Sequence, residues 1–428
     1  MPYKIAGTKN ETSRIIIIDE TDYSIEKTVL IEGSGEYEVE VTEGKKTILA
    51  RLNTGETVGY GGVDAVEMLG AIISDGEVFN SGDTEHVSVA KLTDAKAIVC
   101  YTDAGNSDFG TACVLDISGS TITAGNECIF NNGNTQYGVS VTKLTDTKAI
   151  VCYTDTGNSG YGTSCVLDIS GSTITAGDEH VFNNAATTRT SVTKLTDTKV
   201  IVCYNGYTGG FQGSARILNI DGATITAGSQ RIFNSNDNTW YISVTALTST
   251  KAIVCYRDHD GSNYRGVTCI LDVSGSSISA RSEYVFNNVD TRYISVTGLT
   301  DTKAIVCYQD YGGGGHGIIN ILDINSSIIT VGDEYVFNSD WTDYISVTKL
   351  TDTKVIVCYK YYYGDNYYGT TRVLNISGST ITAGDEHIFN NGSTYYISIT
   401  ALTNTEAVVC YKDVGNNDYG TAKLIYNL

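Results

Sequence analysis

Short runs rich in Val, Ile, Thr and Tyr alternate with polar residues along most of the chain, and turns containing Gly, Asn, Asp or Ser separate them. In the unit that begins near Val139, we expect strands at residues 139–144, 148–155 and 162–169 and an outer strand that ends at Phe182. This period of two residues is typical of strands, and no convincing helical period accompanies it. The pattern predicts an all-β protein.

The tripeptide Val-Cys-Tyr marks an internal repeat. Its cysteines lie 51 or 52 residues apart, at Cys100, Cys152, Cys203, Cys255, Cys307, Cys358 and Cys410. A period of about 50 residues with four short strands in each unit is typical of β-propeller blades. We therefore predict a seven-bladed β-propeller.

The two ends of the repeat indicate that the ring closes. After Cys410 the last unit supplies its third strand, residues 420–428, and no fourth strand. A segment of the fourth-strand type, Asp75 to Asn80, precedes the first full unit. We expect this segment to complete the last blade by strand exchange, which removes the open edges of the sheet.

The residues before about position 70 do not share the repeat. About five strands separated by Gly-containing turns are expected between Arg14 and Tyr60. They predict a small β-sandwich over residues 1–70, followed by the propeller over residues 71–428. The pattern around Gly35 and Glu43 resembles carboxypeptidase-regulatory-like or immunoglobulin-like modules, and this resemblance implies an attachment domain.

The chain is strongly acidic, with a net charge of −21 and a pI near 4.5. Binding to nucleic acid depends on Lys and Arg residues that displace counterions, so we expect no nucleic-acid partner. No apolar stretch approaches the length of a membrane span, and the polar N-terminus lacks the apolar region of a secretion signal. We expect that the protein is made in the cytoplasm and does not insert into a membrane.

Seven of the eleven cysteines recur at one strand position, so we expect buried free thiols in a reducing compartment. Disulfides across a hairpin are the alternative, if Asp103 faces Gly110. That register gives three facing pairs: Cys100 and Cys113, Cys152 and Cys165, and Cys255 and Cys269. Because directly opposed strand cysteines form strained disulfides, free thiols are favoured.

The sequence offers little catalytic or metal-binding chemistry. It contains no HExxH, CxxC, P-loop or GxSxG motif, and we predict a non-enzymatic protein with no cofactor and no metal. His180 and His387 occupy an outer-strand position that other blades fill with Arg or Tyr, which indicates a solvated rim. Five second strands end in an aspartate, at Asp103, Asp155, Asp258, Asp310 and Asp413. Calcium binding is one interpretation, but we favour carboxylates that accept the N–H groups of their own turns.

The repeats differ mainly on one face of the ring. Turns between the first and second strands, and between the third and fourth, are nearly uniform. The loops of the opposite face diverge and contain the five aromatic residues that we predict to bind ligand: Trp240, Trp341, Tyr361, Tyr362 and Tyr363. Rigid rings beside short polar side chains suit stacking on sugars or contact with a protein surface. Tyr293, Tyr344 and Tyr396 share a position before the inner strand and are expected to be structural.

The string Tyr-x-Asp-x-Gly-Asn-x-x-Tyr-Gly-Thr, at residues 153–163 and 411–421, resembles the repeats of propellers in tailed-bacteriophage structural proteins. The resemblance implies a virion protein, made in the host cytoplasm, whose N-terminal domain contacts other virion proteins. It also implies a propeller displayed as in tail-fibre or receptor-binding proteins, where it binds a host-surface glycan or protein.

Three other functions compete with this one. A bacterial lectin or adhesin-like propeller would need an export signal, and the sequence shows none. A purely architectural decoration protein of a capsid or tail would bind no host ligand. A glycan-active enzyme would need a pair of carboxylates near the channel. The inner strands instead repeat a serine, at Ser88, Ser140, Ser191, Ser243, Ser295, Ser346 and Ser398.

Overall fold

The structure is a computed structural model of the whole chain. It describes residues 71–428, apart from residues 208–209, 236–238, 260, 262 and 365 and the side chain of Tyr363, and the backbone of the strands between Tyr3 and Asp64. The chain divides into two compact units, residues 1–72 with 427–428, and Ile73–Tyr426. This division lies close to the expected domain boundary after residue 70.

The first unit contains strands in two antiparallel sheets. One sheet pairs β1 (Tyr3–Lys9) with β4 (Gly35–Val41). The other has the order β3-β2-β5-β6, made of β2 (Ser13–Asp19), β3 (Ile25–Ile31), β5 (Lys45–Arg51) and β6 (Thr57–Asp64). The packing of these two sheets as a sandwich stays a prediction. The strand β1 is additional to the prediction, because its alternation is short and its partner strand lies far along the chain.

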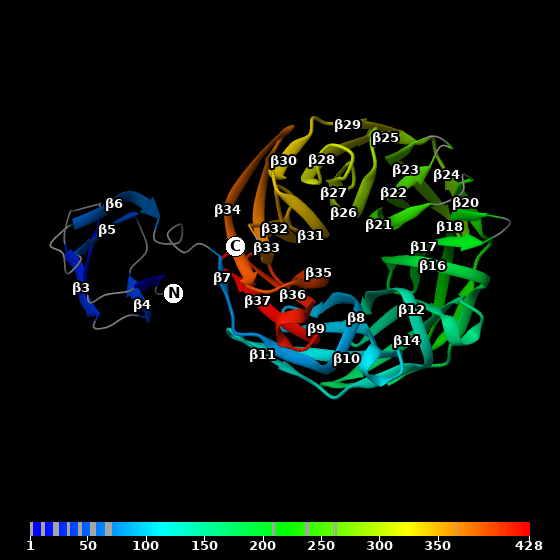
Figure 1. Cartoon of the computed structure of the whole chain (residues 1–428), viewed down its shortest axis with the longest axis horizontal. Coiled ribbons are helices and arrows are strands. Elements are labelled where there is room, and N and C mark those ends of the chain that lie inside the picture. The colour runs from blue at the N-terminus through cyan, green and yellow to red at the C-terminus, as the bar shows by residue number, and fades with distance from the viewer. Residues whose placement is uncertain are drawn as a thin grey trace. The chain divides into compact units, whose positions relative to one another are not determined.

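The second unit is a ring of seven antiparallel blades, numbered here from the blade of β9 to the blade of β36 (Figure 1). The inner strands are β8 (Glu77–Thr93), β12 (Cys128–Thr145), β16 (His180–Thr196), β21 (Trp240–Thr248), β26 (Thr291–Thr300), β31 (Trp341–Thr351) and β35 (Thr394–Ala401). The second strands are β9 (Lys96–Asp103), β13 (Lys148–Asp155), β17 (Lys199–Tyr207), β22 (Lys251–His259), β27 (Lys303–Asp310), β32 (Lys354–Tyr363) and β36 (Glu406–Asp413).

The third strands are β10 (Phe109–Ser118), β14 (Tyr161–Ser170), β18 (Phe211–Asp221), β23 (Tyr264–Ser274), β28 (His316–Asn325), β33 (Asn366–Ser377) and β37 (Tyr419–Tyr426). The outer strands begin with β11 (Thr121–Ala124), β15 (Thr173–Ala176), β19 (Thr224–Ala227), β24 (Ser277–Ala280), β29 (Ile328–Val331) and β34 (Thr380–Asn390). Several continue in a second piece, either β20 (Arg231–Asn234), β25 (Tyr284–Asn287) and β30 (Tyr335–Asn338) or the first residues of β12 and β16. Figure 1 shows the blades arranged around a central axis. The predicted seven-bladed propeller is confirmed.

Strand exchange closes the ring as predicted. The first residues of β8 pair with β37 of the last blade, with Glu77 opposite Ala422 and Asn80 opposite Gly420. The short strand β7 (Ile72–Ile73) precedes it, and the Ser74 amide donates to the Leu424 carbonyl over 2.9 Å. The last blade therefore takes its outer strand from the start of the propeller.

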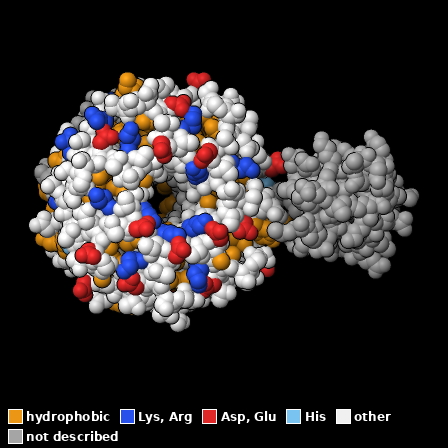
Figure 2. Space-filling model, turned by 180° about the vertical axis from the view of Figure 1, so that it is seen from behind, with side chains coloured by type: hydrophobic (Ala, Val, Ile, Leu, Met, Phe, Trp, Pro, Cys, Tyr) orange, Lys and Arg blue, Asp and Glu red, His pale blue; other side chains and the backbone are white. Residues whose placement is uncertain are grey.

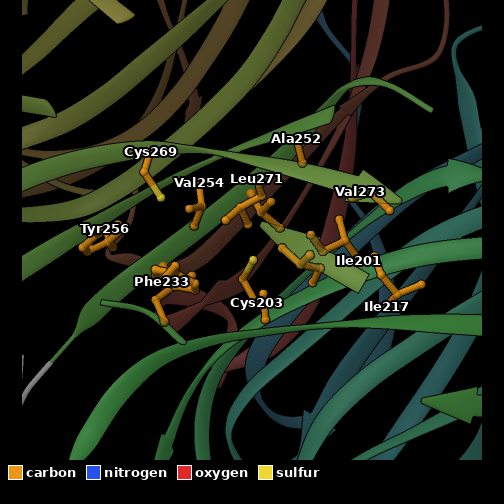
Figure 3. Packing of buried hydrophobic residues seen from close by; sticks show 14 of the residues in the cluster. Ile201, Cys203, Ile217, Phe233, Ala252, Val254, Tyr256, Cys269, Leu271 and Val273 are labelled. Atoms are coloured by element: carbon orange, nitrogen blue, oxygen red, sulfur yellow. The ribbon is translucent and has the colours of Figure 1, made fainter. Parts of the chain in front are cut away.

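One aromatic pair joins each blade to the next. A phenylalanine of the outer strand lies 5.1–5.3 Å, between ring centroids, from the Val-Cys-Tyr tyrosine of the following blade in all seven interfaces. Figure 3 shows one such pair, Phe233 and Tyr256, in the packing between blades 3 and 4. The phenylalanine lies over a glycine of the third strand, and a Cβ on Gly266 would come 2.4 Å from the ring of Phe286. This contact explains why the repeat keeps its glycine.

The repeated serine has a structural role. Each Ser Oγ accepts a hydrogen bond from a backbone N–H of the next inner strand, at 3.0–3.2 Å in all seven steps around the ring. Val141 thus donates to Ser88, and Val89 donates to Ser398 across the closure. The inner strands have no strand neighbour on this side, so the serines satisfy N–H groups that would otherwise be unpaired.

The facing cysteine pairs are not formed, because the register differs by one residue from the alternative considered above. Asp103 pairs with Phe109, so Cys100 lies opposite Ala112, and Cys113 lies opposite Val99. A shift of one residue sends a strand side chain to the other face of the sheet. The same shift separates the other two pairs. All eleven cysteines are free, as predicted, and burial raises the pKa of Cys113 to about 12.

Three of the five aspartates near the ends of the second strands, Asp155, Asp310 and Asp413, have the predicted turn contacts. Asp103 instead accepts a hydrogen bond from the Asn80 side chain, and Asp258 accepts one from the Arg265 guanidinium. The Asp155 carboxylate accepts the Asn158 N–H at 3.1 Å, and that of Asp413 accepts the Gly415 N–H at 3.1 Å. Among the described residues, no group of three or more His, Cys, Asp and Glu side chains is placed to hold a metal ion. His180 and His387 are half-buried, so their rim position is less solvated than expected. No helix in the described part of the chain has the length and apolarity needed to cross a membrane.

Candidate functional site

Every inner strand contains an irregularity where it begins to line the channel. In blade 1, Glu85 pairs with Thr102 and Ser88 with Cys100, so two residues of β8 face only Tyr101. Such a bulge leaves its extra residue free to turn away from the ladder. One residue per blade has a positive φ here, between 49° and 64°: His86, Tyr137, Arg189, Tyr241, Tyr293, Tyr344 and Tyr396. We call these seven residues the mouth ring.

A positive φ is costly for these residue types. Outside glycine, the left-handed region costs on the order of 1–3 kcal/mol for each residue and persists only where the surrounding structure imposes it. Five members of the mouth ring are tyrosines, whose bulk makes the conformation rarer still. Backbone strain of this kind collects at binding and catalytic sites. The same strain in all seven blades therefore marks the mouth of the channel as a candidate site.

The mouth ring surrounds a pocket of about 600 Å³. All seven ring residues line it, together with the apolar residues that follow several of them, such as Ile242 and Ile294, and with Asn205, Phe211 and Trp240. The described residues that line the pocket include no carboxylate. A concave site of this volume, mainly aromatic and apolar with a few polar groups, is typical of a small-molecule site.

Six of the seven ring members form a continuous chain of contacts. Neighbouring aromatic centroids lie 4.9–5.6 Å apart from Tyr241 through Tyr293, Tyr344 and Tyr396 to His86. The guanidinium carbon of Arg189 lies 5.3 Å from the ring centroid of Tyr241. Tyr137 is the seventh member and is 56% exposed. The mouth therefore presents packed, pre-positioned rings.

Burial determines which members of the mouth ring carry charge. It raises the pKa of Tyr293 and Tyr344, and that of Tyr396 to about 12, so their hydroxyls remain protonated hydrogen-bond donors. Burial, and secondarily the charge of Arg189, lowers the pKa of His86 to about 4. At neutral pH the ring thus has one charged member, Arg189.

A buried lysine connects the mouth ring to the outside of blade 6. Lys360 Nζ lies 3.9 Å from the ring centroid of Tyr395 and 4.6 Å from that of Tyr367. Its counter-charge is Asp343, whose carboxylate lies 3.8 Å away. Burial raises the pKa of Asp343, and Lys360 opposes this rise. Because Tyr395 also lies 5.1 Å from Tyr344, contacts extend from the pocket through Tyr395 and Lys360 to Tyr367.

Trp240 is the predicted site residue that lies in the pocket. It is the first residue of β21, not a loop residue as expected, since the strand begins earlier than the sequence suggests. The Arg189 guanidinium carbon lies over its indole, 4.2 Å from the ring centroid. Trp240 thus holds a charged member of the mouth ring in place.

The other four predicted residues belong to blade 6, and the three whose side chains are described, Trp341, Tyr361 and Tyr362, do not line the pocket. They too are strand residues: Trp341 begins β31, and Tyr361–Tyr363 end β32. Trp341 and Tyr362 face each other in the ladder and are 40% and 39% exposed. Tyr362 packs 4.8 Å from Tyr367, whereas Trp341 packs 5.3 Å from Tyr311 of blade 5.

Tyr361 differs from its neighbours because it is half-buried against Tyr359 and Tyr368. The side chain of Tyr363 lies outside the described residues. The exposed part of the predicted site is therefore Trp341 and Tyr362, with Tyr367 beside them. These three residues form a rim patch at the far end of the contacts that begin at Tyr344 and pass through Tyr395 and Lys360.

The mouth ring itself was not predicted from the sequence. Tyr293, Tyr344 and Tyr396 do pack on one another, which agrees with a structural role, but they also line the pocket. The available signal was one variable position per repeat, filled by Tyr, Arg or His, which lies two residues before the repeated serine in six blades and three residues before it in blade 2. That signal does not reveal the bulge or the positive φ.

No family model matches the chain, and no curated protein matches its sequence. The chain is similar to a solved lectin structure from Burkholderia pseudomallei, with a TM-score of 0.57 and 6% identity over 82% of this chain and 97% of that one. A protein of unknown function from Dyadobacter fermentans aligns with a TM-score of 0.53 and 11% identity over 83% and 99% of the two chains. A protein from Lactobacillus plantarum aligns with a TM-score of 0.50 and 9% identity over 89% and 98%. At these identities the likeness shows a shared all-β propeller-type fold.

Proposed function

We propose that this propeller is a carbohydrate-binding protein and that its ligand enters the pocket inside the mouth ring. The observation that carries the proposal is the positive φ of seven non-glycine residues around one pocket of about 600 Å³. Tyrosine rings stack on the apolar faces of sugars, and their hydroxyls exchange hydrogen bonds with sugar hydroxyls. A lectin with the same type of fold supports the proposal, since the architecture accommodates sugar binding.

The rim patch of Trp341, Tyr362 and Tyr367 extends this site. Its rings are exposed, and contacts through Tyr395 connect it to Tyr344 in the pocket. An oligosaccharide that enters the mouth has this row of aromatic residues on which to lie. The rim patch is accordingly a secondary subsite, and its loss weakens the binding of longer glycans more than that of monosaccharides.

The proposed activity is binding without catalysis. Glycoside hydrolysis usually requires two carboxyl groups that flank the scissile bond. The described residues lining the pocket include no Asp or Glu, and the nearby Asp343 is paired with Lys360. Incubation with the bound glycan, followed by mass spectrometry, tests this point: appearance of a shortened glycan contradicts it.

A glycan array probed with the full chain tests the main proposal. The variant Tyr293→Gly/Tyr344→Gly removes two rings of the mouth while keeping a residue suited to the backbone. We expect it to lose at least tenfold in affinity for every glycan bound by the unmodified chain, and Trp341→Ala/Tyr362→Ala to lose affinity mainly for longer glycans. The matched control is Tyr161→Ala, a half-buried tyrosine on the same face that does not line the pocket. Binding that survives the mouth variant overturns the assignment of the site.

Display on a virion is the biological setting that we propose, on the basis of the sequence resemblance alone. In this setting the N-terminal domain contacts other virion proteins, and the propeller presents the mouth ring to a host-surface glycan or protein. Cross-linking mass spectrometry of particles that carry the chain tests it. Cross-links from residues 1–70 to a capsid or tail protein support display, whereas absence of the chain from purified particles favours the lectin or adhesin alternative.

A further inference from the structure

Arg189 is the member of the mouth ring that departs most from the others. Five blades place a tyrosine at this position and one places a neutral histidine, whereas blade 3 places a guanidinium. Its φ of 57° is as strained as that of its neighbours, so the fold directs this charge into the pocket in the same way.

The Arg189 guanidinium has aromatic neighbours but no acidic partner. It lies over Trp240 and beside Tyr241, and within the described part of the chain no hydrogen bond or ion pair involves it. Stacking on a ring face leaves the N–H groups at the edge of the guanidinium plane available.

Other cations on this face of the ring are paired. Arg257 Nε lies 2.7 Å from Asp290 Oδ1, and Arg292 Nη2 lies 2.9 Å from Asp290 Oδ2. Lys412 Nζ lies 3.5 Å from Asp418 Oδ1. A chain with 49 acidic residues thus leaves the one cation of the mouth ring without a carboxylate. An unpaired guanidinium held over an indole is a pre-organised receptor for a planar anion.

We propose that the ligand is an acidic sugar whose carboxylate binds Arg189 while the sugar ring stacks on the neighbouring tyrosines. This inference rests on the proposed function and adds the chemical class of the ligand. A carboxylate accepts two parallel N–H bonds from a guanidinium, which gives orientation as well as affinity. The negative charge of Asp290 does not oppose binding of the sugar carboxylate, because Arg257 and Arg292 neutralise it.

The pocket favours a sugar acid over an acidic peptide. Its lining is mainly aromatic and apolar and surrounds about 600 Å³, which suits one or two rigid sugar rings. A peptide would need partners for its backbone N–H and C=O groups, and the lining offers mainly tyrosine hydroxyls and Asn205.

The test uses the full chain and glycans in matched acidic and neutral pairs, such as trigalacturonate with the corresponding galactose trimer and sialylated with desialylated oligosaccharides. We expect the acidic member of the bound pair to bind at least tenfold more tightly at low salt, with a preference that falls as salt rises. The variant Arg189→Gln should abolish this preference for the acidic member, because glutamine carries no charge with which to bind the carboxylate. Arg189→Lys should retain part of the preference, and the control Arg231→Gln, an exposed outer-strand residue, should retain all of it.

The outcomes separate the two proposals. If neutral glycans bind best, or if Arg189→Gln keeps the full acidic preference, the role of Arg189 is overturned and carbohydrate binding stands. A preference for sulfated over carboxylated partners also overturns the assignment of a carboxylate. If neither member of any pair binds, the proposed function fails, and this inference fails with it.

Discussion

The two ends of the central channel are built by the same seven repeats and differ in almost every property. At one end, the inner strands of four blades carry a lysine that donates to a leucine carbonyl of the preceding blade, as Lys143 does to Leu92, and that pairs with an aspartate three residues on. Figure 2 shows one face of the ring, with basic and acidic side chains around its central opening. At the other end the mouth ring holds aromatic side chains in strained backbone conformations.

This difference shows how the repeats divide their tasks. The turns, the serines and the Phe-Tyr-Gly contacts are nearly the same in every blade, because each of them joins one blade to the next. The mouth ring contains Tyr, Arg and His at equivalent positions, because it needs only the shared bulge to direct its side chains. These shared contacts between blades, which we call the hub, can therefore hold a mouth ring whose backbone is strained and whose side chains vary.

The largest expected effect comes from the uniform part. Phe337 is fully buried in the contact with Tyr359. Phe337→Ala should lower the free energy of unfolding by about 3–5 kcal/mol, the usual cost of removing a buried phenylalanine. Urea denaturation measures the loss, and Trp341→Ala is the control, expected to change stability by about 0.5 kcal/mol or less because it lies at an exposed rim. Equal losses in both variants would contradict the division between hub and rim.

The pH dependence of stability tests the burial of His86. Its pKa is about 4 in the folded chain and near 6.5 when unfolded, so the unfolded state binds more protons between these values. This contribution to stability is complete above about pH 6.5 and falls as the pH drops toward 4, by on the order of 1–3 kcal/mol. His86→Gln should show a correspondingly smaller loss between pH 7 and pH 4 in urea titrations. Parallel profiles for the two proteins would show that His86 is not buried as a neutral group.

The backbone strain of the mouth ring predicts an inverted order of two substitutions. At Tyr293, with a φ of 49°, glycine relieves strain and alanine does not, although both remove the ring. Tyr293→Gly should be more stable than Tyr293→Ala by about 1 kcal/mol. At the neighbouring Ser295, where no positive φ occurs, alanine should be the more stable of the pair. Thermal unfolding of the four variants measures whether glycine is the more stable substitution at Tyr293 and alanine the more stable one at Ser295. If the same residue is the more stable one at both positions, the bulge with a positive φ at Tyr293 is contradicted.

The smallest effect concerns the ring of serines. Ser243→Ala removes the Oγ that accepts the Val296 N–H over 3.1 Å. The loss should be about 1 kcal/mol, the usual cost of leaving one backbone donor with a poorer partner. Hydrogen exchange should accelerate at Val296 and remain unchanged at Val347, whose acceptor is Ser295. Unchanged exchange at Val296 would show that the serine ring does not protect the inner strands.

The sequence predicts the fold well because its signals repeat. Val-Cys-Tyr, the glycine turns and the fourth-strand segment at Asp75 to Asn80 each recur or match a recurrence, and the structure confirms blades, ring and closure. The cysteine register is harder to predict. The second strands are buried on both faces, as Ala97 to Tyr101 show, so no alternation indicates which face a side chain takes.

The sequence by itself determined the number of blades and the exchange that closes the ring, because these depend on local pattern and on matches between distant copies. Only the tertiary structure decided where the aromatic residues act. A bulge exists only relative to a paired strand, so the positive φ of Tyr344 or Arg189 cannot be seen before β31 or β16 is paired with its neighbour. Closure of the ring then brings seven positions about 52 residues apart to one pocket, and it leaves Trp341 and Tyr362 at the rim outside it.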